Sequence, residues 1–196
     1  MFLYDKILEY PVNITKKDLK MAKIIASQYG GPQGELGAAI RYLNQRVTMP
    51  DEYGKSLLND IGTEELAHIE MLQTMISQLM KGATIDEIKA AGLDAYYTEH
   101  GKDLFPENAS GVPFTTAYIS ATGDVIANIV EDMAAEQKAR TVYENILRFS
   151  DDPDVNRVIK YLRQREIVHF QRFGEALDNL QSKMCEKKTI VPGIKF

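Results

Sequence analysis

The sequence predicts an all-α protein, a four-helix bundle with a long crossover between its second and third long helices. Apolar residues recur at intervals of three and four in several long segments, which is the spacing of one face of an α-helix. The alternating pattern of strands is weak throughout the chain. Residues 92–115 contain three glycines and two prolines, so we interpret them as the connector that crosses the bundle.

Capping and breaking residues bound the expected elements. Thr15 ends an N-terminal arm, residues 1–15, and is the expected N-cap of the first helix. The Gly-Gly-Pro sequence at 30–32 breaks the helical path, because glycine costs a helix entropy and proline lacks a donor. Thr84-x-x-Glu87 resembles a capping box. The expected helices are 16–29, 32–48, 51–81, 84–91, one from 115 or 122 to 149, and 153–184. Residues 185–196 are an expected tail, and we interpret 1–196 as one domain.

Length, composition and charge exclude several classes of function. The 196 residues suit one domain with a sizeable core, and the net charge of -5 offers no basic face for nucleic acid. No segment approaches the roughly 18 apolar residues of a membrane span, and the N-terminus lacks the basic and apolar regions of a signal peptide. We therefore expect synthesis in the cytoplasm and no membrane partner. Cys185 is the single cysteine, so any metal ligands must be histidines and carboxylates.

A Glu-x-x-His motif lies in the middle of the helix expected at 51–81. Three residues are just under one helical turn, so Glu65 and His68 leave the same face. They fill a gap in the apolar stripe and should face the core. An unpaired charge in a core is too costly to keep, and a metal ion is the simplest compensation.

The motif is repeated in the second half of the chain, together with an upstream glutamate. The residues that map onto each other with one offset of 101 positions are Glu35 and Glu136, Glu65 and Glu166, His68 and His169, and Tyr42 and Tyr143. We interpret the repeat as two helix hairpins, each with a lone Glu on one helix and Glu-x-x-His on the other. This is the ligand pattern of di-iron and di-manganese bundles. Carboxylates bridge such cations, and neutral imidazoles suit Mn, Fe or Zn.

Other polar residues have simpler interpretations. Surface positions on solvated helix faces are expected for Glu64, Glu70, Glu131 and Asp132. Asp132 precedes Glu136 by one turn, so a position beside the ligands is the alternative. Tyr42 and Tyr143 could be core aromatics, although a tyrosine two turns from a ligand can also hydrogen-bond a ligating carboxylate. We expect a surface histidine at His100, an incidental thiol at Cys185, and packing roles for Met71, Met75 and Met80.

Several motifs over most of the chain resemble those of the manganese catalases, a ferritin-like family. They are Met1-Phe2 with the Tyr10 arm, Gly30-Gly31-x-x-Gly34-Glu35, Asp60-x-Gly62-Thr63-Glu64-Glu65-x-Ala67-His68-x-Glu70-Met71, the stretch from Tyr118 to Gly123, Arg165-Glu166-x-x-His169 and Ile190-Val191-Pro192-Gly193. The short chain and the Tyr-Pro near the N-terminus are most similar to the spore-coat members, which are CotJC-like.

The resemblance implies a site with two manganese ions per chain. The implied assignments are Glu35 and His68 on one ion, Glu136 and His169 on the other, Glu65 as the bridge, Glu166 as a carboxylate outside the coordination sphere that carries protons, and Tyr42 as a tyrosine next to the ligands. Two features depart from the family pattern. Ala135 stands where some members carry Arg, so access to the cluster is expected to differ. Longer members also have a C-terminal extension that wraps a neighbouring subunit.

The resemblance implies a manganese catalase that converts hydrogen peroxide to water and oxygen. The same six residues would also serve a di-iron oxidase, peroxidase or ferroxidase, with iron as the alternative metal. A structural spore-coat or storage protein with a vestigial site is the other alternative. We further expect a homo-oligomer, for which a hexamer is one candidate, and a spore-coat location with other coat proteins as candidate partners.

Overall fold

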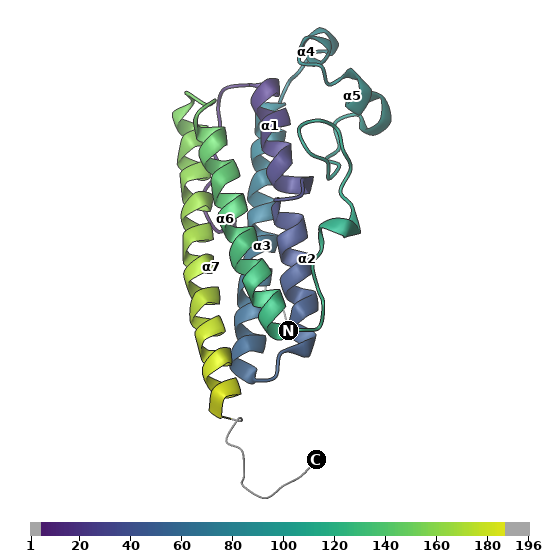
Figure 1. Cartoon of the computed structure of the whole chain (residues 1–196). Coiled ribbons are helices and arrows are strands. Elements are labelled where there is room, and N and C mark those ends of the chain that lie inside the picture. Colours follow the sequence, from purple (N-terminus) through teal and green to yellow (C-terminus); the bar gives the residue numbers. More distant parts are fainter. Residues whose placement is uncertain (1–4, 187–196) are drawn as a thin grey trace, which may run out of the picture.

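The computed structural model describes residues 5–186, and its long elements form a four-helix bundle (Figure 1). The bundle consists of α1 (Leu19–Gly30) followed end to end by α2 (Glu35–Gln45), then α3 (Glu52–Leu79), α6 (Val125–Leu147) and α7 (Pro153–Glu186). One hairpin packs α1 and α2 against α3, and the other packs α6 against α7. No strand occurs between residues 5 and 186, where a single isolated bridge is the one β feature. The predicted all-α bundle is confirmed.

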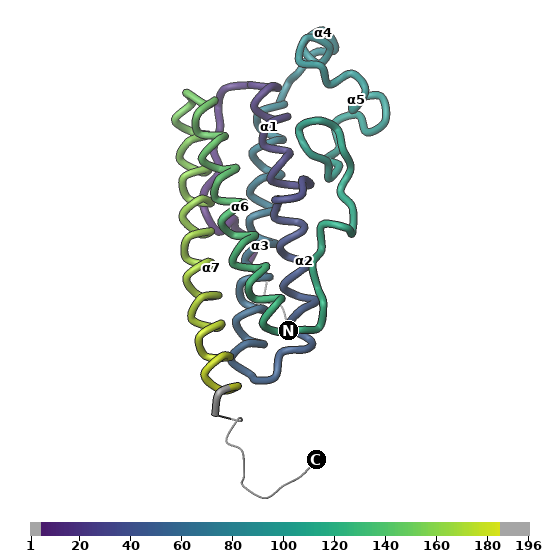
Figure 2. The backbone as a smooth tube through the Cα atoms, viewed as in Figure 1, coloured from purple at the N-terminus to yellow at the C-terminus, as the bar shows by residue number. Residues whose placement is uncertain are grey.

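The crossover between α3 and α6 returns the chain to the opposite end of the bundle (Figure 2). It carries α4 (Ile85–Ala90), α5 (Asp94–His100) and the 3₁₀ turn η2 (Thr116–Tyr118), whereas the turn η1 (Arg46–Thr48) closes the short α2–α3 connection. As a result, α6 runs in the same direction as α3, which is the connectivity predicted from the sequence.

The first helix begins later than predicted because a different residue caps it. Asp18, not Thr15, accepts a hydrogen bond from the Met21 backbone N–H at 2.9 Å. The capping box of Thr84 and Glu87 is confirmed at the start of α4. The last helix continues two residues beyond the predicted end at 184, and residues 187–196 lie outside the described part of the chain.

Residues 92–115 belong to the predicted crossover, but they also contain α5, a helix that was not predicted. Leu93, at its N-terminus, is buried with Leu19 and Ile88 in a small apolar cluster, and this burial favours a helical turn there. His100 lies on α5 in the crossover and is partly exposed, in keeping with the surface position predicted for it. Its ring stacks on Phe105 with 4.2 Å between the ring centroids, and its side chain is 22% exposed.

Two apolar clusters divide the interior along the bundle axis. Ile25, Leu72 and Ile159 belong to the cluster nearer the end of the bundle at which α4 and α5 lie (Figure 1). The cluster nearer the other end includes Leu58 and Phe173. Met71 and Met75 lie in the first cluster and Met80 packs against it, which confirms their packing role. Along α3, the buried charged residues fall between the two clusters. Among the described helices, none combines the length and apolarity that crossing a membrane requires.

Candidate metal centre

Six buried ionisable side chains meet between the two apolar clusters. The six are Glu35 on α2, Glu65 and His68 on α3, Glu136 on α6, and Glu166 and His169 on α7. Each is at most 1% exposed. Glu35 is the first residue of its helix, at the break after Gly34, and the others lie within helices. The folded chain therefore brings together all six residues that the repeat singled out.

Both imidazoles face the same carboxylate. His68 Nδ1 lies 2.7 Å from Glu65 Oε2, and His169 Nδ1 lies 2.9 Å from Glu65 Oε1. The two rings stack with 5.8 Å between centroids and 24° between planes. Glu65 thus lies between equivalent nitrogen atoms of the two hairpins, the place of a carboxylate that two cations share.

The donor atoms form two overlapping groups. One group contains Glu35, Glu65, His68 and Glu166, the other contains Glu65, Glu136, Glu166 and His169, and within each the donor atoms lie within 4.8 Å of one another. Several of these atoms are buried without a hydrogen-bond partner, among them Glu35 Oε2, Glu136 Oε2, Glu166 Oε1 and His169 Nδ1. Buried polar atoms are normally satisfied, so this set fits a centre of cations held by oxygen and imidazole nitrogen.

Without cations, the site must share protons among its carboxylates. Burial raises the pKa of Glu35 and of Glu166, and the neighbouring carboxylates raise both further. Burial also acts to raise the pKa of Glu65, but His169 and His68 more than offset it, so that pKa is lowered. Burial acts to lower the pKa of His169, yet Glu65 and the other carboxylates raise it well above its usual range. Cations would remove this conflict because they favour the ionised carboxylates.

Two buried tyrosines connect the hairpins to each other. Tyr42 on α2 donates to Glu136 on α6, and Tyr143 on α6 donates to Glu35 on α2. Each tyrosine therefore supports the glutamate of the opposite hairpin. From the sequence we predicted that Tyr42 lies next to the ligands, but we gave Tyr143 no such role, although the 101-residue offset makes the two tyrosines equivalent.

Glu64 was predicted wrongly as a solvated residue. Its side chain is 15% exposed and pairs with Arg165, with 2.5 Å between Arg165 Nε and Glu64 Oε1. Burial acts to raise the Glu64 pKa, but His169 and Arg165 more than offset it and lower the pKa to about 2. Glu64 directly precedes Glu65 and therefore lies close to the ligand face of α3, which explains why its side chain reaches the histidines.

Asp132 was also predicted wrongly as solvated. It is completely buried, and neither carboxylate oxygen has a well-formed hydrogen bond. Burial raises its pKa, although Gln45 and Arg41 act to lower it. Its position one turn before Glu136 was the feature of the sequence that indicated a place beside the ligands. Glu131, in contrast, pairs with Lys138 near the surface at 3.2 Å.

A small cavity between α2 and α6 reaches the cluster. Its lining includes Ala38, Tyr42, Ala135, Ala139 and Glu166. It offers about 10 Å³ to water-sized molecules, which is on the order of one water. Glu166 therefore borders a space of about the size of one water molecule.

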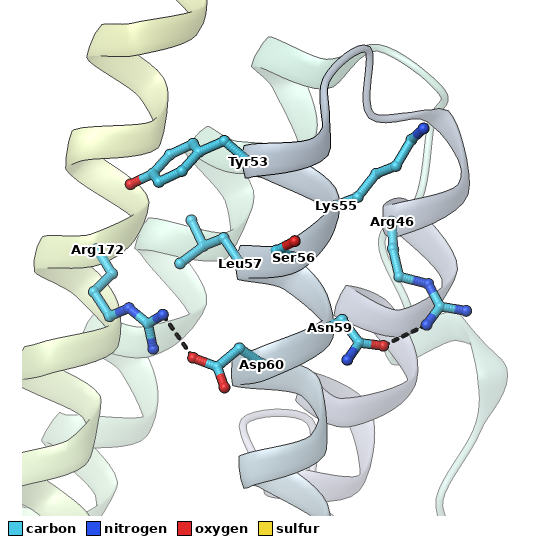
Figure 3. A pocket seen from close by; sticks show the side chains of 8 residues that line it. All are labelled: Arg46, Tyr53, Lys55, Ser56, Leu57, Asn59, Asp60 and Arg172. Atoms are coloured by element: carbon cyan, nitrogen blue, oxygen red, sulfur yellow. Dashed lines mark hydrogen bonds and ion pairs between the residues drawn. The ribbon is translucent and has the colours of Figure 1, made fainter. Parts of the chain in front are cut away.

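A larger pocket lies on the surface beside the start of α3 (Figure 3). It has about 510 Å³ of space, and it is lined by Arg46, Tyr53, Lys55, Ser56, Leu57, Asn59, Asp60 and Arg172. None of the six buried residues lines it. The candidate centre is therefore the buried cluster and not this surface pocket.

Comparison with known proteins assigns the chain that carries this cluster to a family. A family model described as "Manganese containing catalase" matches residues 1–195. This chain belongs to the manganese catalase family. Protein CotJC of Bacillus subtilis is 50% identical over 188 residues, which are 96% of this chain and 99% of that protein.

Other members of the family agree with this assignment. A probable manganese catalase of Clostridium acetobutylicum is 36% identical over 95% of this chain and 84% of its own length. The crystal structure of KatB, a manganese catalase from Anabaena, matches with a TM-score of 0.84 and 30% identity, covering 100% of this chain and 85% of KatB. The predicted ferritin-like fold and CotJC-like family are thus confirmed.

Proposed function

We propose that this chain binds two manganese ions and converts hydrogen peroxide to water and oxygen. The observation that supports this most is the pair of overlapping donor groups, which share Glu65 and Glu166 and contain unsatisfied buried donor atoms. In this proposal Glu35 and His68 hold one ion, Glu136 and His169 hold the other, and Glu65 bridges them. The bound ions would supply a two-electron redox couple, as in a manganese catalase.

The chain itself would bind peroxide and move its protons. The small cavity beside Glu166 admits molecules close to water in size, which favours peroxide over larger substrates. Glu166 has one carboxylate oxygen without a hydrogen-bond partner. We assign it as the base that takes a proton from one peroxide and gives it to another, because a carboxyl group beside the substrate can both accept and donate a proton. Tyr42 and Tyr143 would hold the ligands Glu136 and Glu35 in place.

Metal analysis combined with oxygen evolution tests this proposal. Protein loaded with manganese should contain two ions per chain and evolve oxygen from peroxide without an added reductant. The variant His68→Ala should lose metal and activity, whereas the control His100→Gln changes a histidine outside the cluster and should keep both. Iron in the isolated protein, with turnover only in the presence of a reductant, would favour a di-iron enzyme instead.

A structural role in the spore coat is the second candidate, and the likeness to Protein CotJC favours it. A chain with both ions bound and negligible peroxide turnover would support that role. We also propose a homo-oligomer, which light scattering at working concentration would show. A monomer would contradict this part of the proposal.

A further inference from the structure

One pair of equivalent positions in the repeat breaks its chemical symmetry. Glu64 and Arg165 are related by the same offset of 101 residues that relates the ligands, yet they carry opposite charges. They meet across the two hairpins, with 2.5 Å from Arg165 Nε to Glu64 Oε1 and 3.2 Å from Arg165 Nη2 to Glu64 Oε2. This two-point contact is the geometry in which Arg holds a carboxylate most firmly. A second glutamate at 165 would instead place two like charges together.

The Glu64 carboxylate lies behind both imidazoles. His169 Nε2 is 3.1 Å from Glu64 Oε2, and His68 Nε2 is 3.8 Å from Glu64 Oε1. The Nδ1 atoms of the same rings face Glu65 on the other side. Each ring is therefore placed between two carboxylates. The His68 distance is longer than a hydrogen bond, and Glu9 Oε2 lies 4.0 Å from the same His68 Nε2. Neither Nε2 atom has a hydrogen-bond partner, although both rings are fully buried.

We propose that Glu64 is a single positioning residue for both metal-binding histidines, and that Arg165 holds it in place. The inference rests on the proposed metal centre. A neutral imidazole that presents the Nδ1 lone pair to a metal must carry its proton on Nε2. A carboxylate that accepts this N–H fixes the tautomer and the ring orientation and makes the imidazole a stronger ligand. Glu64 is assigned to both rings because its carboxylate lies within 4 Å of both Nε2 atoms.

A third cation site is the competing interpretation of the same cluster. Ligand atoms of Glu9, Glu64 and His68 lie within 4.8 Å of one another. Arg165 already contacts both oxygens of Glu64, however, and its positive charge opposes a cation there. Glu9 also accepts a hydrogen bond from Tyr161 at 2.6 Å. The structure therefore favours an accepted N–H over a bound ion.

The test compares Glu64→Gln with a matched control on the same two helices. Glu64→Gln keeps the shape of the side chain but removes its charge. Its amide NH₂ group would face the Nε2–H group of one imidazole, so two hydrogen-bond donors would meet there. Asp60→Asn removes another α3–α7 ion pair, Arg172 Nη2 to Asp60 Oδ2 at 2.6 Å, which no histidine contacts (Figure 3). A third variant, Arg165→Gln, leaves Glu64 in place and loosens it, so the inference stays testable if Glu64→Gln does not fold.

Cobalt(II) binding gives readouts that do not depend on catalysis. In the cobalt-loaded wild type and in Asp60→Asn, proton NMR should show two shifted imidazole N–H resonances that exchange slowly with water. In Glu64→Gln at least one resonance should be lost to exchange, and cobalt affinity in chelator competition should fall about 10–100-fold. Arg165→Gln should show a smaller loss of affinity and faster exchange.

The outcomes separate this inference from the proposed function. Unchanged resonances and affinity in Glu64→Gln, equal to those of Asp60→Asn, would overturn it. Three cobalt ions per wild-type chain would also overturn it, in favour of the third cation site. A wild type that binds two ions but evolves no oxygen from peroxide would contradict only the catalase proposal.

Discussion

At the scale of single residues, the repeat places identical side chains in unequal surroundings. Glu65 and Glu166 are equivalent by the offset and belong to both donor groups. The two histidines lower the pKa of Glu65, whereas burial and three neighbouring carboxylates raise the pKa of Glu166. Glu65 and Glu166 therefore occupy equivalent positions in their helices, but their neighbours shift the two pKa values in opposite directions. This difference supports a bridging role for Glu65 and a proton-carrying role for Glu166.

Substitution by glutamine should separate these roles. Glu166→Gln keeps the shape but removes the basic group, so we expect two manganese ions per chain and peroxide turnover reduced about 10²–10⁴-fold, the usual contribution of a general base. Glu65→Gln removes the charge shared by both ions and should lose metal as well as activity. Metal analysis with an oxygen electrode measures both effects. If Glu166→Gln loses metal as severely as Glu65→Gln, Glu166 is a ligand; if it keeps full turnover, it does not carry the protons.

At the scale of elements, the break between α1 and α2 positions both the first ligand and the crossover. Glu35 owes its place to the new helix that starts after Gly34. The crossover packs directly on the end of α1, where a Cβ on Gly30 would lie 2.3 Å from the carbonyl carbon of Pro106. Glycine is required there because the neighbour is backbone, which cannot turn away as a side chain can.

Alanine at Gly30 should therefore destabilise the fold. We expect the free energy of unfolding of Gly30→Ala to fall by about 1–3 kcal/mol, as for other overpacked sites. Gly174→Ala is the control, because a Cβ there meets the Met133 side chain at an ordinary 3.6 Å within α7. That change should stabilise the protein by about 0.5–1 kcal/mol, the usual gain over glycine in a helix. Urea denaturation measures both, and equal effects would show that the crossover moves aside.

At the scale of the whole molecule, metals should stabilise the bundle, and more so as the pH rises. In the folded metal-free chain the pKa values of Glu35 and Glu166 lie above their unfolded values. Such groups favour the fold at pH below the unfolded pKa, and this contribution is lost as the pH rises through the folded pKa. Cations remove the penalty, because they bind the ionised ligands and compete with protons for them.

Calorimetry of metal-free and manganese-loaded protein across pH tests this linkage. The loaded protein should melt at a higher temperature at neutral pH, and the difference should shrink as the pH falls toward the unfolded carboxyl pKa. The double variant Glu35→Gln, Glu166→Gln removes the two titrating groups, so its metal-free form should lose less stability with rising pH. Equal melting temperatures of loaded and metal-free protein at neutral pH would contradict a buried metal centre.

The parts of the fold and site that the sequence predicted are those with a local period or a repeat. The spacing of Glu65 and His68 on one helix face, and its copy 101 residues later, predicted the six residues that the structure gathers. The helix α5 was missed because the apolar cluster beside it contains Leu19, which is far from Leu93 in the sequence. The N-cap of α1 was misplaced for a local reason, since both Thr15 and Asp18 can cap a helix, and aspartate, the better N-cap of the two residue types, is the one that does so.

The sequence by itself determined the bundle, the two hairpins, the six clustered residues and the family. These follow from periodicity and from residue types, which act through local backbone geometry. Only the tertiary structure decided that Tyr143 supports Glu35, that Glu64 faces both histidines, and that Asp132 is buried. The physical reason is that hydrogen bonds across hairpins and the dielectric environment of a carboxylate depend on which helix faces meet, and helical spacing along one segment does not specify that.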